Sequence, residues 1–235
     1  MTRTSSLAKI SRPSPSGVFP RHRLFRLLDH SRAQPITWIT GPPGSGKTTL
    51  VTSYLDAREI PSLWYQVDEG DADIASFFYY LGLAAKKAAP RKRKPLPLLT
   101  PEYLQGIPTF SRRYFENLYS RLIPVSHHRS PHPLRGLDTK GRLKQKASKQ
   151  GFAIIFDNYQ EVPEGSPFHE VLREGLTQVP DGINIILISR RDPPDAYVRL
   201  RANRLMEIIG WNELKFTLDE SKRMFRFLGV GPIWM

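Results

Sequence analysis

The chain has 235 residues, of which 35 are Lys or Arg and 22 are Asp or Glu, giving a formal net charge of +13. Hydrophobic residues make up 40% of it, enough for one domain core, which excludes a fully disordered or collagen-like chain. The absence of cysteine excludes a disulfide scaffold, thiol catalysis and thiolate zinc sites. No apolar run approaches the roughly 20 residues of a membrane span, and no secretory signal is present. We therefore expect a soluble, cytoplasmic protein with no membrane partner.

The hydrophobic pattern predicts alternating strands and helices. Short, mainly apolar runs predict buried strands at residues 36–40, 62–67, 152–157, 183–189 and 205–209. Apolar residues at helical spacing predict helices at residues 19–29, from 47 onward, at 74–85, 115–122, 168–176 and 217–228. This alternation predicts an α/β fold with a mostly parallel five-stranded sheet and helices on both faces.

The remaining segments are expected to lie outside this regular structure. Residues 1–17 are rich in Ser, Pro and Arg and are expected to form a flexible leader. The domain is expected at residues 18–228, and residues 229–235 are expected to form a short tail. The stretch 90–108 is rich in proline and is expected to be irregular. Two end signals are specific: Asp71 or Asp73 is available to cap the helix at 74–85, and a T-x-x-E capping box opens the last helix.

The positive charge is concentrated in one segment. Residues 86–150 hold 16 Lys or Arg and only three acids, so the rest of the chain is neutral. Within that segment, residues 124–150 have few apolar side chains and predict an exposed or disordered basic insertion. Such charge could make weak, nonspecific contacts with nucleic-acid phosphates. A solvated loop is the favoured interpretation, because the basic clusters lack aromatic residues for stacking and no recognition helix is evident.

A phosphate-binding motif follows the first predicted strand. It is G-x-x-x-x-G-K-T, and its residues, with the next threonine, are Gly41, Pro42, Pro43, Gly44, Ser45, Gly46, Lys47, Thr48 and Thr49. Glycines let backbone amides turn toward phosphate oxygens, the lysine adds charge, and the Thr48 hydroxyl is a hard ligand for Mg²⁺. The buried strand before it and the helix after it supply the context that the mechanism needs. The alternative is a glycine-rich turn that binds nothing.

A second motif is the acid at the end of the strand 152–157. Asp157 is placed to hold the metal that Thr48 also binds, although strands also end in Asp for turn reasons. Asn158 follows where many such NTPases carry a second acid that activates water, and an amide cannot accept a proton. Nucleotide binding could then persist with slow hydrolysis. Glu161 is a possible substitute base.

A guanidinium stands at the end of the strand 183–189. If this strand lies beside the phosphate-loop strand, Arg190 could reach a γ-phosphate, distinguish ATP from ADP and stabilise transferred charge. The alternative is a surface arginine paired with Asp192 or Asp195.

Several blocks together resemble the STAND-class ATPase domain of large bacterial transcription regulators, of the maltose-regulon activator and LuxR-like type. The blocks are FPRHRL at 19–24, GPPGSGKTTL at 41–50, LWYQVDEGD at 63–71, FDNYQ at 156–160 and LISR at 187–190. The resemblance implies a three-layer P-loop NTPase of the ASCE/AAA-like kind. It implies that ATP or ADP with Mg²⁺ sets an on or off state.

The resemblance also assigns individual residues. Val18 and Arg21 or Arg23 match a segment that contacts the adenine side, and Lys47, Thr48 and Thr49 match phosphate and Mg²⁺ contacts. Asp157 matches the metal-side acid and Arg190 the sensor arginine, whereas Asn158 departs from the usual second Asp. Relatives continue into winged-helix, helical-repeat and DNA-binding domains, which this chain lacks, so we expect a nucleotide-binding fragment or truncated product.

Three functions follow from these observations. The favoured one is a Mg-ATP-binding signalling switch of transcription regulation, at most a slow ATPase. The alternative is a nucleic-acid-binding module acting through residues 86–150. A kinase for a small substrate ranks lowest, because no lid or acceptor site is evident.

Overall fold

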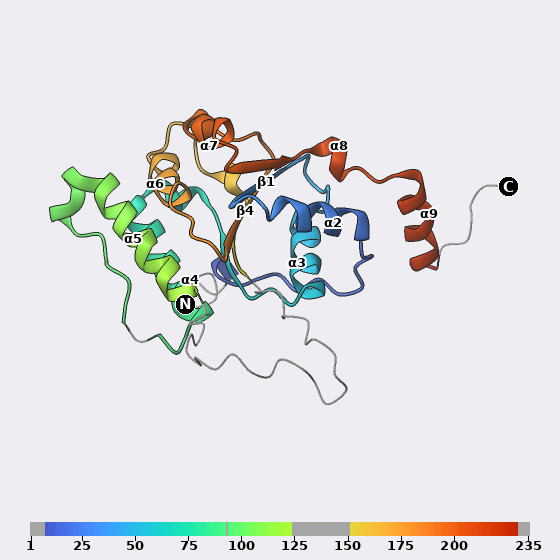
Figure 1. Ribbon diagram of the computed structural model, residues 1–235, viewed down its shortest axis with the longest axis horizontal. Helices are drawn as coiled ribbons and strands as arrows, with labels where there is room; N and C mark the ends of the chain where they lie inside the picture. Colours follow the sequence, from blue (N-terminus) through green and yellow to red (C-terminus); the bar gives the residue numbers. More distant parts are fainter. Residues whose placement is uncertain (1–7, 93, 124–150, 230–235) are drawn as a thin grey trace, which may run out of the picture.

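The computed structural model describes residues 8–92, 94–123 and 151–229, which fold around a five-stranded sheet (Figure 1). The strands are β1 (Ile36–Thr40), β2 (Ser62–Gln66), β3 (Phe152–Asp157), β4 (Ile183–Ser189) and β5 (Met206–Ile209). Their order is β2-β3-β4-β1-β5, and every neighbouring pair is parallel. All five predicted strands are confirmed to within a residue at their ends, and the sheet is wholly parallel.

The register brings the ends of three strands together. Thr40 of β1 lies opposite Ser189 of β4, and β3 lies on the other side of β4. In a parallel sheet the carboxyl ends share one edge, and this is where ligands of open α/β sheets bind. The phosphate motif after β1, the acid ending β3 and the arginine after β4 are therefore gathered at one edge.

Helices cover both faces of the sheet and complete three layers. They are α2 (His22–Ser31), α3 (Lys47–Ala57), α4 (Ile74–Ala88), α5 (Ile107–Leu122), α6 (Phe168–Leu176), α7 (Val198–Ala202), α8 (Trp211–Leu214) and α9 (Leu218–Phe227). Because side chains alternate along a strand, Trp38 of β1 enters the larger core beneath α4, α5 and α6, and Ile39 enters the smaller core beneath α2 and α3. Figure 1 shows α9 standing apart from the layers, at the end opposite α4 and α5.

Helix α5 begins eight residues earlier than the prediction of 115–122. Proline 108 lies in its first turn, where the missing amide hydrogen has no helical acceptor in any case, so Pro108 starts the helix instead of breaking it. A short 3₁₀ turn, η2 (Pro101–Gly106), precedes it. The expectation of an irregular stretch up to residue 108 was therefore wrong for its last part.

The N-terminal segment is another correction. Residues 1–17 were expected to be a flexible leader, but Lys9 is buried and donates from Nζ to Asp71 Oδ2 at 2.9 Å. Asp71 is itself fully buried and accepts a hydrogen bond of 2.6 Å from the Tyr65 hydroxyl. Because a buried carboxylate needs compensating charge, this ion pair holds the segment against β2. Asp71 is thus occupied, and Asp73 caps α4 through the amides of Ala75 and Ser76.

Some expectations fall outside the described residues. These are the basic insertion at 124–150, residues 1–7 of the leader, and all but the first residue of the tail at 229–235. Within the described part of the chain, no helix has both the length and the apolar character that a bilayer crossing needs.

Packing between α5 and α6 gives a test of the core. A Cβ built on Gly175 would lie only 2.5 Å from the Phe115 ring. We expect Gly175→Ala to lower the free energy of unfolding by about 1–3 kcal/mol, because overpacking outweighs the better helix propensity of alanine. Gly165→Ala is the matched control, since a Cβ there meets nothing within 4 Å. Equal urea midpoints for the two variants would contradict this packing.

Candidate functional site

The phosphate loop connects β1 to α3. Gly44 and Gly46 have φ angles of 73° and 78°, a left-handed conformation that glycine adopts without strain. The first helical hydrogen bond of α3 runs from the Leu50 amide to the Gly46 carbonyl, at 2.8 Å. The amides of residues 47–49 precede that bond and have no acceptor within the helix. Unpaired amides and the positive end of the helix dipole at such a helix start favour negative charge.

The loop lysine is buried and folded onto its own loop. Lys47 is 8% exposed, and Nζ donates to the carbonyls of Gly41 at 2.6 Å and Pro42 at 2.9 Å and to Ser45 Oγ at 3.2 Å. Burial lowers the pKa of Lys47, as does the positive charge of Arg190, while the charge of Asp157 opposes both effects. An incoming anion would reverse that balance and stabilise the charged ammonium.

Thr48 and Asp157 join α3 to the end of β3. The Thr48 hydroxyl lies 3.1 and 3.0 Å from the two carboxylate oxygens of Asp157. Asp157 is 4% exposed, and burial raises its pKa, opposed by hydrogen bonds from Thr48 and the Asn158 amide and by the charge of Lys47. A hydroxyl and a carboxylate side by side are the hard oxygen donors that Mg²⁺ prefers, so the residues present fit this metal.

These groups line one cavity of about 320 Å³, here called the phosphate-loop cavity. The predicted site residues that line it are Pro43, Gly44, Ser45, Gly46, Lys47, Thr48, Thr49, Asp157, Asn158 and Arg190. Gly41 and Pro42 contribute through the carbonyls that hold the lysine. The structure thus gathers residues from three separate stretches of sequence at one edge of the sheet.

Arg190 lines the cavity because β4 pairs directly with β1. Its predicted role depends on these two strands being neighbours. Its side chain is half exposed, and Nη1 lies 4.0 Å from Glu161 Oε1. Among the described residues, no ion pair joins it to Asp192 or Asp195, the partners of the alternative interpretation. Its guanidinium is therefore available to an anion in the cavity.

Gln160 was missed as a site residue by the sequence analysis. Its Oε1 accepts the Arg190 amide at 3.0 Å, its Nε2 donates to Glu161 Oε1 at 2.8 Å, and the side chain lines the cavity. The contact ties the end of β3 to the end of β4 across thirty positions of sequence, which no local pattern signals. Glu161 does not line the cavity, so the structure gives no support to it as a substitute base.

Asn158 has a special backbone position. Its φ of 60° and ψ of 36° are left-handed, a conformation that Asn and Asp tolerate better than other side chains. The residue precedes the 3₁₀ turn η3 (Tyr159–Glu161), and its amide donates to Asp157 Oδ1 at 2.9 Å. The local geometry therefore admits either an amide or a carboxylate at this position.

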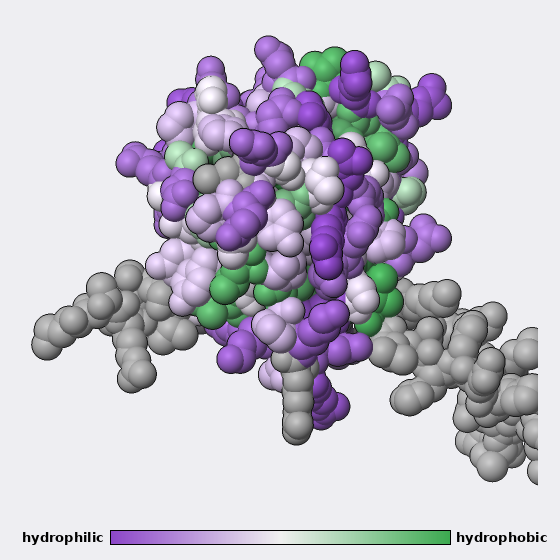
Figure 2. Space-filling model, turned by 90° about the vertical axis from the view of Figure 1, so that its left-hand side faces the viewer, coloured by the Kyte–Doolittle hydropathy of each residue, from purple (hydrophilic) through white to green (hydrophobic). Residues whose placement is uncertain are grey.

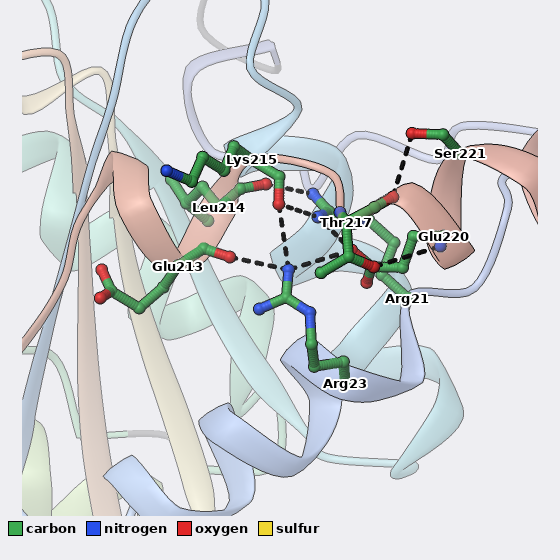
Figure 3. A network of polar contacts seen from close by, with 8 residues as sticks. All are labelled: Arg21, Arg23, Glu213, Leu214, Lys215, Thr217, Glu220 and Ser221. Carbon is green, nitrogen blue, oxygen red and sulfur yellow. Dashed lines mark hydrogen bonds and ion pairs between the residues drawn. The ribbon is translucent and has the colours of Figure 1, made fainter.

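Arg21 and Arg23 lie elsewhere, in a network around Glu220 of α9 (Figure 3). Glu220 Oε2 accepts from Arg21 Nη2 at 3.1 Å and from Arg23 Nη2 at 3.0 Å. Arg21 Nη1 also donates to the Leu214 carbonyl at 2.6 Å, which fixes α8. We call this the Glu220 network. Neither arginine lines the phosphate-loop cavity, nor does half-buried Val18, and their contact with adenine stays a prediction.

The Glu220 network nevertheless touches the loop. Leu214, whose carbonyl Arg21 holds, has its Cδ1 atom 3.1 Å from where a Cβ of Gly41 would lie, and Trp211 packs beside it. A side chain at position 41 would therefore meet α8. The first glycine of the motif serves close packing of α8 on the loop.

A parallel sheet in this order, a glycine-rich loop leading from β1 into a helix, and an acid ending β3, with β4 between the two strands, define a P-loop NTPase domain. A family model described as "Nephrocystin 3, N-terminal" matches residues 18–190, and the chain belongs to that family.

Curated relatives agree with the resemblance seen in the sequence. The "HTH-type transcriptional regulator MalT" of Vibrio cholerae is 27% identical over 221 residues, 93% of this chain and 21% of that protein. The protein of the same name from Vibrio parahaemolyticus is 26% identical over 220 residues, again 93% of this chain and 21% of that protein. The chain thus spans about a fifth of the length of these relatives.

One solved structure also aligns, that of the Aeropyrum pernix ORC1 protein in complex with DNA. Its TM-score is 0.47 and its identity 14%, over 89% of this chain and 49% of that one. The assignment of the fold rests on the strand order and motifs of the chain itself.

The Glu220 network makes the attachment of α9 depend on pH. Burial alone would raise the pKa of Glu220, but hydrogen bonds from Arg23, Arg21 and the Thr217 amide outweigh it and lower the pKa from 4.5 to about 2. Because the folded pKa is depressed, the stabilisation is complete above pH 4.5 and is lost as the pH falls toward about 2. We expect Glu220→Gln to destabilise α9 by about 1–3 kcal/mol at neutral pH and by progressively less in acid, measured by amide hydrogen exchange.

The control for Glu220→Gln is Asp219→Asn, whose exposed pair with Arg223 is expected to change α9 protection by less than about 0.5 kcal/mol. A Glu220→Gln effect that stays constant from neutral pH down to pH 3 would contradict the assigned ion pair.

Proposed function

We propose that the chain is an ATP- or ADP-binding switch domain that uses Mg²⁺ and turns ATP over slowly or not at all. The observation that carries the proposal is the contact of Thr48 with Asp157 in the same cavity as Lys47. A hydroxyl, a carboxylate and an ammonium close together support binding of a polyphosphate with its cation.

The loop would bind the phosphates with backbone and lysine together. The free amides of residues 47–49 would donate to phosphate oxygens, and Lys47 would exchange the carbonyls of Gly41 and Pro42 for stronger, charge-assisted partners. That exchange costs little backbone movement, because the ammonium already lies in the cavity. Phosphate binding would also restore the pKa that burial has lowered.

Thr48 and Asp157 would hold Mg²⁺. The bound ion would neutralise charge on the phosphate oxygens. Asp157 is suited to this role because it is buried yet keeps hydrogen bonds that favour its ionised form. The Thr48 hydroxyl, which now donates to Asp157, would turn its oxygen lone pair to the metal.

Arg190 and Gln160 would make the bound state depend on the γ-phosphate. A guanidinium that contacts only the triphosphate binds ATP differently from ADP, and a differential contact is what shifts a two-state equilibrium. The hydrogen bond from the Arg190 amide to Gln160 would carry a movement of Arg190 to the turn after β3.

Slow turnover follows from Asn158. Its side-chain amide can orient water but cannot accept its proton, and Glu161 lies outside the cavity lining. The site as proposed can therefore bind and report a nucleotide while lacking a general base beside Asp157.

The relatives named as transcriptional regulators support a cytoplasmic role in bacterial signal transduction and transcription regulation. The match covers about a fifth of those proteins, so we propose for this chain the nucleotide-dependent part of such a regulator. The alternative, a nucleic-acid-binding module at residues 86–150, gains no specific observation, because much of that segment lies outside the described residues.

Lysine 47 provides the first test of this proposal. We expect Lys47→Ala to weaken ATP and ADP binding by roughly a hundredfold, because the only buried ammonium facing the phosphates among the described residues is lost. Isothermal titration calorimetry with Mg-ATP measures the effect, and Lys222→Ala, an exposed lysine on α9, is the control. Unchanged binding by Lys47→Ala would refute the nucleotide site.

Asparagine 158 provides the test of turnover. We expect Asn158→Asp to raise the rate of ATP hydrolysis about ten- to a hundredfold with little change in ATP affinity, because a carboxylate can accept the proton of water and the left-handed backbone tolerates Asp. Steady-state phosphate release measures the rate. The control is the double variant Lys47→Ala/Asn158→Asp, which should release no more phosphate than Lys47→Ala. An unchanged rate in Asn158→Asp with intact binding would place the limit on catalysis elsewhere.

A further inference from the structure

Buried cations in this fold divide into two kinds. Among the described residues, four Lys or Arg are buried: Lys9, Arg21, Lys47 and Arg121. Lys9 is paired with Asp71 and Arg21 with Glu220. The described part of the chain contains no ion pair for either Lys47 or Arg121. Burying a cation without a counter-ion destabilises the folded protein unless a bound anion neutralises the charge. For Lys47, the proposed phosphate site supplies such an anion.

Arg121 on α5 is therefore the second buried cation that a bound anion would stabilise. It is 9% exposed, its Nη2 donates to the Lys92 carbonyl, and its buried Nε has no hydrogen-bond partner in the described structure. Arginine cannot discharge itself by losing a proton, so the charge remains in the partly desolvated site.

Arg121 lines a cavity of about 360 Å³ between α4, α5 and parts of the stretches 90–92 and 95–98, which we call the α4–α5 pocket. Lys86 and Lys92 are also among its lining residues, and none of the described residues that line it is acidic. Accessible apolar side chains also line it: Tyr79 of α4 is 52% exposed and Leu98 of the proline-rich segment is 64% exposed. The volume lies in the range of small-ligand sites.

The surface around this pocket contains both apolar and hydrophilic residues. Figure 2 views the molecule from the side on which α4 and α5 lie in Figure 1, and apolar patches there are separated by strongly hydrophilic residues. The α4–α5 pocket shares no lining residue with the phosphate-loop cavity. A ligand in it would therefore not compete with a nucleotide for the same contacts.

We propose that the α4–α5 pocket binds a small organic anion with an apolar body. The carboxylate lies toward Arg121 and Lys86, and the apolar part packs against Tyr79 and Leu98. Charge selects the anion, since all three ionisable groups other than tyrosine are cations. The accessible apolar lining favours an organic anion over a bare inorganic ion, because burying the surface of Tyr79 and Leu98 supplies the remaining affinity.

The test is calorimetric titration of the nucleotide-free protein with four probes: octanoate, octanol, octylammonium and inorganic phosphate. We expect octanoate to bind at one site, at least about tenfold more tightly than each other probe, since one charged hydrogen bond and the apolar chain both contribute. Failure of octanoate to bind, or equal binding of octanol, octylammonium or phosphate, would overturn the proposal.

Variants locate the site. Arg121→Gln should weaken octanoate binding about tenfold and Lys86→Gln about threefold, while Arg113→Gln, an exposed arginine on the same helix, should leave it unchanged. Circular dichroism melts check that each variant is folded. If Arg121→Gln does not fold, the two Lys86 variants test the site. Lys86 is exposed, so both variants should fold, and Lys86→Glu should weaken octanoate binding more than Lys86→Gln. Octanoate affinity that is unchanged in both Lys86 variants would overturn the assignment.

Discussion

The contact between Thr48 and Asp157 is the interaction on which the site depends. It connects the first turn of α3 to the last residue of β3 and so holds the phosphate loop against the neighbouring strands. The contact exists because all five strands are parallel, which brings their carboxyl ends to one edge. Without that direction Lys47, Asp157 and Arg190 would lie at different ends of the sheet.

Compensation of buried charge shapes the rest of the molecule. Asp71 is stabilised by Lys9 and Tyr65, and the N-terminal segment is fixed to β2 as a result. Glu220 is stabilised by two arginines, and α8 and α9 are attached in consequence. Lys47 and Arg121, the two buried cations without an ion pair among the described residues, each line a cavity. The same electrostatic rule therefore explains both how terminal segments attach and where ligands are expected.

The segment before α2 is connected to the phosphate loop through α8. Arg21, before α2, holds the carbonyl of Leu214, and Leu214 packs on Gly41 at the start of the phosphate motif. A change in the position of the loop therefore reaches α8 directly and α9 through the Glu220 network. If the proposed nucleotide switch operates, this connection would give it a physical route to the C-terminal helix, in addition to the route from Arg190 through Gln160.

The sequence by itself determined the strands, the order of alternation and the phosphate loop, because these depend on local apolar runs and on glycine at fixed spacing. It also predicted roles for Asp157, from its place at a strand end, and for Arg190, chiefly from the family resemblance, and the structure brings both residues to the same cavity. Only the tertiary structure decided that Lys9 is buried, that Pro108 starts a helix, that Gln160 joins β3 to β4 and that Arg21 and Arg23 bind Glu220. These contacts join residues far apart in sequence, and their formation depends on which surfaces meet after the sheet has formed, a property that no local pattern records.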